Sequence, residues 1–219
     1  MTHICAIGFD LDNTLYKVSE PINIQIRAQA CKYAAELLKR DYAKTVADFT
    51  EQYALTQSAS TSLQNIGIQS SALAKELVQR ALEEANVAKY IEPNKKLADM
   101  LLRLKNNYHL FLITGSRHSI AQGKLDALQI PGNVFEMAIY AESKYRREDG
   151  SAFAYVHGKL AAPYKNTIFV GDRETVDILP AKKKGLKTII VNNKSLHADF
   201  FLTDICELED IVAQIESQN

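Results

Sequence analysis

Short apolar segments separated by stretches of helical periodicity constrain what this 219-residue chain can fold into. They span residues 4–9, 109–113, 137–140, 167–170 and 188–191, with a weaker candidate at 200–202. Short apolar runs of this kind are typical of buried parallel strands. Between them, residues such as Ala121, Leu125 and Leu128 recur at helical spacing. This alternation predicts an α/β fold with a Rossmann-like parallel sheet and right-handed crossovers.

The regular spacing breaks between the first two predicted strands. The intervening residues 17–90 have mainly helical patterns, and a structureless connection of that length is uncommon in a compact domain. We therefore predict an all-helical cap subdomain over 17–90, inserted into an α/β core domain formed by 1–16 and 91–219.

Three local signals refine this helical segment. Residues 45–48 (Thr-Val-Ala-Asp) resemble a capping box that opens a second helix. Ser70 or Ser71 is suited to cap a third helix. Residues 57–69 are rich in Ser, Thr and Gln, which favours a loop between helices.

Composition narrows the classes of partner. Lys and Arg number 26, as do Asp and Glu, and this balance favours neither nucleic acid nor a membrane surface as a partner. No apolar run reaches the roughly 20 residues that span a bilayer, and the first residues do not resemble a signal peptide. The three cysteines lack the spacing of a disulfide framework or a zinc site. A cytoplasmic location is the expectation.

Carboxylates and hydroxyls follow several of the predicted strands. Asp10 and Asp12 follow the first strand, residues 114–116 (Thr-Gly-Ser) follow the second, and Asp172 follows the fourth, with Asp177 five residues later. The carboxyl ends of neighbouring parallel strands meet at one edge of the sheet, where sites usually lie. Oxygen ligands without His or Cys suit Mg2+, which pairs with substrate phosphate.

In their order, these segments resemble the motifs of the haloacid dehalogenase (HAD) superfamily. Residues 10–14 (Asp-Leu-Asp-Asn-Thr) fit its first motif, residues 112–115 (Leu-Ile-Thr-Gly) its second, and residues 169–172 (Phe-Val-Gly-Asp) with Asp177 its fourth. The helical insertion resembles the C1 cap of that superfamily. Residues 9–16, followed by Ser19, are similar to the opening of its pyrimidine 5′-nucleotidase-like branch.

The resemblance implies a role for each matched residue. Asp10 is the expected nucleophile, which forms an aspartyl-phosphate. Asp12 is the expected general acid and then base, with a pKa nearer neutrality than that of Asp10. Thr114, with Gly115 and Ser116, is expected to hold phosphoryl oxygens.

The same resemblance implies a magnesium site. Asp10, Asp172 and the backbone carbonyl of Asp12 are expected to hold Mg2+, with Asp177 orienting this shell. The superfamily's dehalogenases lack an acidic residue at the position of Asp12, so its presence favours phosphoryl chemistry.

The third motif departs from the superfamily pattern, which has a Lys, usually a following Pro, and then a Phe. Aligning Phe153 without gaps places Arg147 at the Lys position, while an offset of three residues places Lys144 there. The family role belongs to Lys, which favours Lys144, although Arg147 also supplies a cation. The second motif departs as well, because Gly115 stands where many relatives have Asn.

These features predict a Mg2+-dependent phosphohydrolase that acts on a small phosphorylated metabolite. A nucleoside 5′-monophosphate is the preferred substrate class, and a sugar or organic phosphate is the nearest alternative. A phosphomutase and a catalytically slack regulatory protein of the same fold remain further alternatives.

Overall fold

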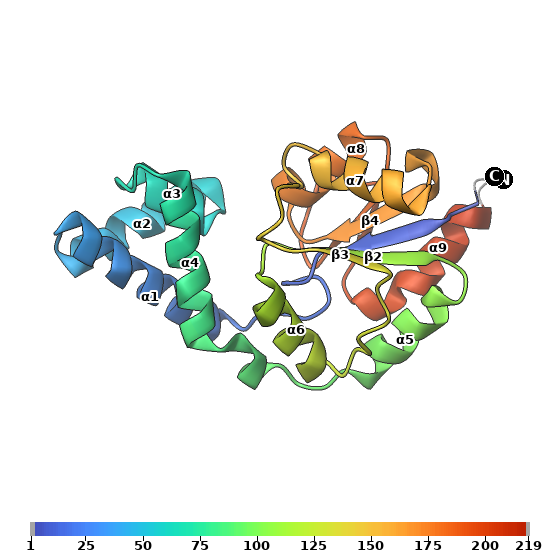
Figure 1. Ribbon diagram of the computed structural model, residues 1–219, viewed down its shortest axis with the longest axis horizontal. Helices are drawn as coiled ribbons and strands as arrows, with labels where there is room; N and C mark the ends of the chain where they lie inside the picture. The colour runs from blue at the N-terminus through green and yellow to red at the C-terminus, as the bar shows by residue number, and fades with distance from the viewer. Residues whose placement is uncertain (1–2, 218–219) are drawn as a thin grey trace. The chain divides into compact units, whose positions relative to one another are not determined.

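The computed structural model describes residues 3–217, which divide into two compact units. One unit comprises Met1–Lys17 with Ile91–Asn219 and contains the sheet, and the other comprises Val18–Tyr90 and is helical. Each is described by itself below. Both are drawn in Figure 1.

A six-stranded parallel sheet forms the centre of the first unit, which confirms the predicted α/β fold. Its strand order is β3-β2-β1-β4-β5-β6, and all six segments expected from the sequence are strands. The strands are β1 (Ala6–Phe9), β2 (His109–Ile113), β3 (Met137–Ile139), β4 (Thr167–Gly171), β5 (Lys187–Val191) and β6 (Phe200–Leu202). The first strand therefore lies between the second and the fourth.

Helices cover both faces of this sheet. In Figure 1, α5 and α9 lie on one side, and α7 and α8 lie on the other. The helices of this unit are α5 (Lys95–Lys105), α6 (His118–Ala127), α7 (Ser151–Leu160), α8 (Leu179–Lys183) and α9 (Leu208–Ser217), and the short turns are η2 (Tyr164–Asn166), η3 (Glu174–Ile178) and η4 (Ile205–Glu207).

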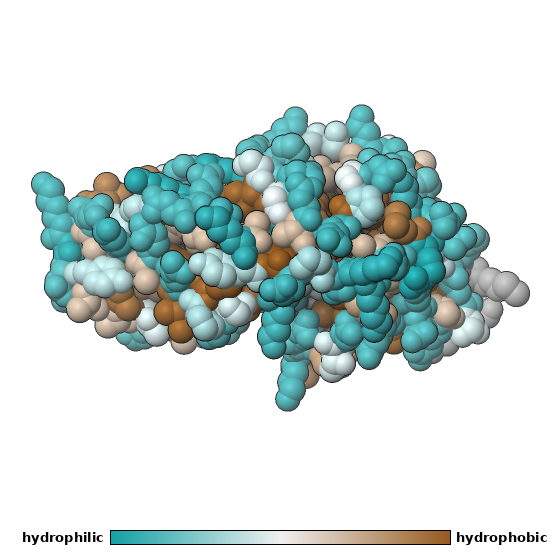
Figure 2. Space-filling view, turned by 90° about the horizontal axis from the view of Figure 1, so that it is seen from below, coloured by the Kyte–Doolittle hydropathy of each residue, from teal (hydrophilic) through white to brown (hydrophobic). Residues whose placement is uncertain are grey.

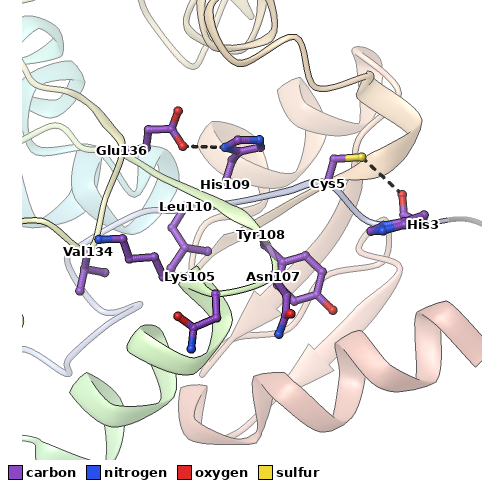
Figure 3. A pocket seen from close by; sticks show the side chains of 10 residues that line it. His3, Cys5, Lys105, Asn107, Tyr108, His109, Leu110, Val134 and Glu136 are labelled. Atoms are coloured by element: carbon purple, nitrogen blue, oxygen red, sulfur yellow. Dashed lines mark hydrogen bonds and ion pairs between the residues drawn. The ribbon is translucent and has the colours of Figure 1, made fainter.

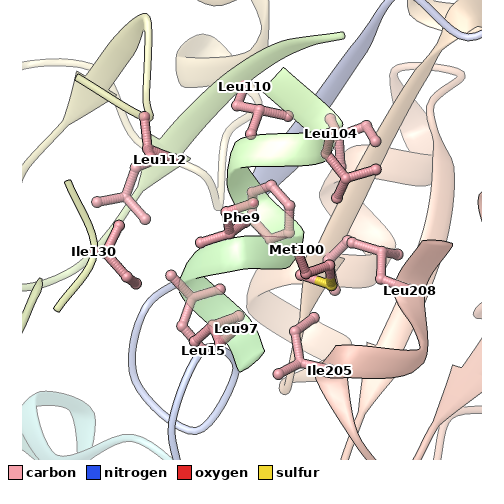
Figure 4. Packing of buried hydrophobic residues seen from close by; sticks show 14 of the residues in the cluster. Phe9, Leu15, Leu97, Met100, Leu104, Leu110, Leu112, Ile130, Ile205 and Leu208 are labelled. Carbon is pink, nitrogen blue, oxygen red and sulfur yellow. The ribbon is translucent and has the colours of Figure 1, made fainter. Parts of the chain in front are cut away.

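The strands bury both faces because successive side chains point to opposite sides of a sheet. Phe9, Leu110 and Leu112 belong to the cluster beneath α5, α6 and α9, part of which is shown in Figure 4. Phe111 and Phe169 belong to the opposite cluster beneath α7 and α8. Burial on both faces explains why the sequences of these strands are continuous apolar runs.

The helical unit contains four α-helices and a short terminal turn. They are α1 (Glu20–Leu38), α2 (Tyr42–Thr56), α3 (Ala59–Asn65), α4 (Ser71–Ala85) and η1 (Val87–Tyr90). Helix α1 packs against α2 and α4. The Arg27 guanidinium lies 4.1 Å from the centre of the Tyr53 ring, and Arg80 lies 4.2 Å from that of Tyr33.

Two local expectations for this unit were wrong. Helix α2 begins one turn before the expected capping box, because the side chain of Asp41 accepts a hydrogen bond from the backbone N–H of Lys44. The supposed loop at 57–69 contains α3, whose N-terminus is capped by Ser58. By contrast, Ser70 caps α4 as expected.

Hydrophilic residues cover much of the α/β unit on the face shown in Figure 2. Among the described residues, none of the helices combines the length and the apolar character that crossing a membrane requires.

Gly8 allows close packing at the middle of the sheet. A Cβ atom at this position would lie 2.1 Å from Cε2 of Phe111 and 2.8 Å from Cδ2 of Phe169. These two rings, whose centres are 6.3 Å apart, occupy the space that a side chain on the central strand would need. The missing side chain therefore keeps β1 tightly packed, directly before Asp10.

We expect Gly8→Ala to lower the free energy of unfolding by about 2 kcal/mol or more, because the new methyl group overpacks a buried site. Urea denaturation measures this change. Gly158→Ala on α7 is the matched control, since its Cβ would meet nothing within 4 Å. A helical Gly→Ala change in open space should be neutral or stabilising by up to about 1 kcal/mol. Equal stability of the two variants would contradict this account.

Candidate active site

The loop after β1 carries the first two acidic residues at the carboxyl end of the central strand. The Asp10 N–H donates to the carbonyl of Val170, which continues the β1–β4 pairing by one residue. The chain then turns, with the N–H of Leu15 donating to the carbonyl of Leu11. Asp10 is buried, whereas about a third of the Asp12 side chain is exposed (33%).

Asp10, Asp172 and Asp177 form a buried acidic cluster. One carboxylate oxygen from each lies within 4.8 Å of the others. Asp172 directly follows β4, and η3 brings Asp177 back toward it. Gly171 makes this approach possible, because a Cβ there would lie 2.4 Å from the Cβ of Asp177. The sheet therefore gathers the three carboxylates that were expected at its edge.

Arg147 is a buried cation that reaches this cluster. Its Nη1 lies 2.6 Å from Oδ1 of Asp10 and 2.6 Å from Oδ1 of Asp177, and its side chain is only 5% exposed. Lys144 is exposed, with its ammonium 5.3 Å from the centre of the Tyr145 ring. Phe153, further along the chain, is buried and packs edge-on against Phe169 in the core.

The departures in the second and third motifs lie side by side. A Cβ at Gly115 would be 3.9 Å from Nη2 of Arg147. At that distance a Cβ would be in ordinary van der Waals contact with the guanidinium, so the two departures from the superfamily pattern are neighbours in the structure.

Burial raises the pKa of Asp10 to about 6, although Arg147 beside it acts in the opposite direction. Burial, together with the neighbouring carboxylates of Asp10 and Asp177, raises the pKa of Asp172 to about 8. Both shifts are caused first by burial and then by neighbouring negative charge, which Arg147 and Arg173 compensate only in part.

The donor atoms of the cluster suit a magnesium ion. Oδ1 of Asp172 is buried without a hydrogen-bond partner, and the nearest ion-pair contact is Nε of Arg173 at 3.8 Å. Both oxygens of Asp177 have donors, namely Nη1 of Arg147 and the backbone N–H of Arg173 at 3.0 Å. Asp10 and Asp172 could therefore bind a cation directly, and Asp177 could orient them.

Asp12 lies against a different set of donors. Its Oδ1 accepts from the Tyr16 hydroxyl and, at 2.6 Å, from Nζ of Lys124, and its Oδ2 accepts from Oγ of Ser116 at 3.0 Å. Burial raises the pKa of Asp12, but the Lys124 ammonium and these hydrogen bonds outweigh it and lower the pKa below its usual range. The expectation that Asp12 titrates nearer neutrality than Asp10 is therefore wrong for this structure.

The residues after β2 lie beside these carboxylates. Thr114 is buried, and its Oγ1 accepts from the N–H of Ser116 at 3.1 Å. Gly115 is exposed. The Ser116 hydroxyl contacts Asp12 and Lys124.

Lys124 was not predicted from the sequence as a site residue, although the sequence pattern around it indicates a buried position. It stands between Ala121 and Leu128 at helical spacing, within an otherwise apolar and buried stripe. A lysine on the inward face of a helix needs a buried partner. No comparable pattern indicated Tyr16, because an aromatic residue near an apolar run is ordinarily interpreted as part of the hydrophobic core.

A separate hollow of about 450 Å³ lies at the opposite, amino-terminal edge of the sheet (Figure 3). Cys5, Tyr108 and His109 are among its lining residues, and His109 pairs with Glu136 at 2.6 Å. It does not include the acidic cluster. In parallel α/β sheets the reacting groups gather at the carboxyl ends of the strands, so we place the candidate active site at the cluster.

A parallel sheet with acidic residues at the carboxyl ends of β1 and β4 defines an α/β protein with its candidate site at that edge of the sheet. The family model for haloacid dehalogenase-like hydrolases matches residues 7–191. The chain therefore belongs to the haloacid dehalogenase-like hydrolase family. A search of curated protein sequences gave no significant match.

Solved structures share the fold across nearly the whole chain. A haloacid dehalogenase-like family hydrolase from Streptococcus pneumoniae is 20% identical with a TM-score of 0.69, covering 96% of this chain and 99% of that one. A HAD phosphatase from Thermococcus onnurineus is 17% identical with a TM-score of 0.64, covering 95% and 98%. A 2-haloacid dehalogenase from Pseudomonas syringae is 18% identical with a TM-score of 0.60, covering 97% and 99%.

The raised pKa values predict how stability depends on pH. Between about pH 4 and pH 8 the folded protein binds more protons than the unfolded chain, so its free energy of unfolding falls as pH rises. In EDTA, we expect a loss of about 2 kcal/mol or more from pH 5 to pH 8. Mg2+ should restore stability at pH 8. Denaturation of the wild type and Asp172→Asn checks this, and equally steep profiles would refute it.

Replacing Arg147 should destabilise the fold, because it leaves Asp10 and Asp177 buried without their cation. We expect Arg147→Met to lower the free energy of unfolding by about 3 kcal/mol or more. Lys144→Met, at an exposed position, is the matched control and should change it by less than about 0.5 kcal/mol. Chemical denaturation at pH 7 compares the two. A larger effect at position 144 would contradict the assignment of Arg147 to the buried cluster.

Proposed function

We propose that this protein is a Mg2+-dependent phosphohydrolase that cleaves small phosphomonoesters through an aspartyl-phosphate on Asp10. The observation that carries the proposal is the buried cluster of Asp10, Asp172 and Asp177, in which Oδ1 of Asp172 has no hydrogen-bond partner. Bound Mg2+ would offset the repulsion between the anionic ester and these carboxylates. Asp10, Asp172 and the Asp12 carbonyl would hold it.

In the first half of the reaction, an oxygen of Asp10 attacks phosphorus and the bond to the ester oxygen breaks. Arg147 holds Oδ1 of Asp10 in place and compensates part of its charge. A proton passes from Asp12 to the departing oxygen, so an alcohol leaves and the phosphoryl group remains on Asp10. The segment at Thr114 and Gly115 contributes donors to the phosphoryl oxygens.

In the second half, Asp12 takes a proton from a water molecule, which attacks the aspartyl-phosphate. Inorganic phosphate is released and Asp10 is regenerated. The donors around Asp12 favour its ionised form, which suits this role as a base. For the first half it must take up a proton before it can give one.

Asp12 also supports phosphoryl chemistry over dehalogenation. Dehalogenases and phosphatases both occur among the structures that share the fold. Cleavage of an ester requires a proton for the departing oxygen, whereas a halide leaves without one. A carboxylate two residues after the nucleophile, held by three donors and still partly exposed, supplies that proton.

We extend the proposal to the substrate class. The segment from Phe9 to Tyr16 resembles the nucleotidase-like branch, which supports a nucleoside 5′-monophosphate as substrate. A sugar or other organic phosphate is the alternative. In this proposal the helical unit, Val18–Tyr90, is a C1-type cap that selects among them.

A screen of nucleotides and sugar phosphates for release of inorganic phosphate, with Mg2+ and then with EDTA, tests the proposal. We expect turnover with Mg2+ only, and a loss of at least about 1,000-fold in kcat for Asp10→Asn because the nucleophile is removed. Asp210→Asn, at an exposed position on α9, is the control and should retain activity. Undiminished turnover by Asp10→Asn would refute the mechanism. Isomerisation without phosphate release would refute hydrolysis and select the phosphomutase alternative.

A further inference from the structure

Lys124 is a fully buried lysine whose ammonium lies at the candidate active site. Its side chain is 1% exposed, and helix α6 directs it back toward the end of β2. Nζ lies 2.6 Å from Oδ1 of Asp12 and 2.9 Å from Oγ of Ser116. Burial disfavours an ammonium ion, so this placement requires the carboxylate beside it.

These contacts close a hydrogen-bonded ring. Lys124 donates to Oδ1 of Asp12 and to Oγ of Ser116, and the Ser116 hydroxyl donates to Oδ2 of Asp12 at 3.0 Å. The Tyr16 hydroxyl is a second donor to Oδ1. A carboxylate held through both oxygens cannot rotate about its terminal bond without breaking at least one of these contacts. The plane of the Asp12 carboxylate is therefore fixed.

A purely structural role explains this lysine poorly. Ala121, Leu125 and Leu128 of the same helical stripe are apolar and buried in the large core cluster. An apolar residue at position 124 would extend that cluster, and replacing a buried ion pair with packed apolar groups is often neutral or stabilising. The pair with Asp12 also reaches an exposed surface, because a third of the Asp12 side chain is accessible (33%).

We propose that Lys124 is a positioning residue that, with Ser116, orients the Asp12 carboxylate for proton transfer to the departing oxygen. This inference rests on the proposed phosphohydrolase function. Oδ1 is occupied by two donors, whereas Oδ2 has a single donor, the Ser116 hydroxyl. Oδ2 is therefore the oxygen that exchanges the proton. Lys124 itself does not touch the substrate.

The test compares two esters that differ in their need for an acid. The alkoxide of 2-glycerophosphate needs a proton to leave, whereas the phenolate of p-nitrophenyl phosphate departs without one. For Lys124→Met we expect kcat/KM for the alkyl ester to fall by about 30-fold or more, and that for the aryl ester by less than about threefold. KM should change little, because the substrate is not contacted. Equal losses on both esters, or no loss on either, would overturn the inference.

The thermal unfolding midpoint of Lys124→Met shows whether this variant folds. If it folds poorly, a second set of variants still tests the inference. Ser116→Ala opens the same ring without burying an unpaired charge, and it should show the same selective loss. In an Asp12→Asn background, Lys124→Met should cost less than about twofold, since its effect passes through Asp12. An undiminished loss in that background would refute the positioning role.

Lys183→Met on α8, at an exposed position, is the matched lysine control and should leave both rates unchanged. The wild type separates the two proposals. If it hydrolyses neither these esters nor any ester in the metabolite screen, the proposed function fails. If the wild type hydrolyses both esters and Lys124→Met lowers kcat/KM equally for both, only the proposed role of Lys124 is refuted.

Discussion

Buried negative charge at the carboxyl edge of the sheet is the constraint on which this site depends. Asp10, Asp172 and Asp177 lie within one small volume, and desolvation favours the neutral forms of Asp10 and Asp172. Arg147 is placed between two of them and compensates part of the charge. The negative charge that is not compensated lies mainly at Asp172, whose Oδ1 has no hydrogen-bond partner. A divalent cation held by oxygen ligands is the chemically natural complement to such a cluster.

The strand order supplies the geometry for this cluster. Because β1 lies between β2 and β4, the residues that follow these strands meet at one edge. Two glycines permit the close approach: Gly8 leaves room for aromatic rings across the central strands, and Gly171 leaves room for Asp177. The core therefore does more than stabilise the unit, since it fixes the separations among the charged groups.

The structure gives the two acidic residues of the first motif separate cations. Arg147 contacts Asp10 from the segment before α7, while Lys124 contacts Asp12 from α6. In the proposed reaction this separation matches two different tasks, attack on phosphorus and transfer of a proton. Burial raises the pKa of both residues. At Asp10 it exceeds the effect of Arg147, whereas at Asp12 the Lys124 ammonium and the hydrogen bonds from Lys124, Tyr16 and Ser116 together outweigh it.

The sequence by itself determined the strands, the α/β class and the acidic residues at strand ends, because apolar periodicity and strand-end polarity are local properties. It did not determine which cation serves Asp10: Arg147 and Lys144 are three residues apart, and only the folded chain shows that Arg147 is buried against Asp10 whereas Lys144 is exposed. Nor did it assign Lys124, since the contact with Asp12 joins residues 112 positions apart. Such pairings arise from the packing of α6 against the sheet, so they belong to the tertiary structure alone.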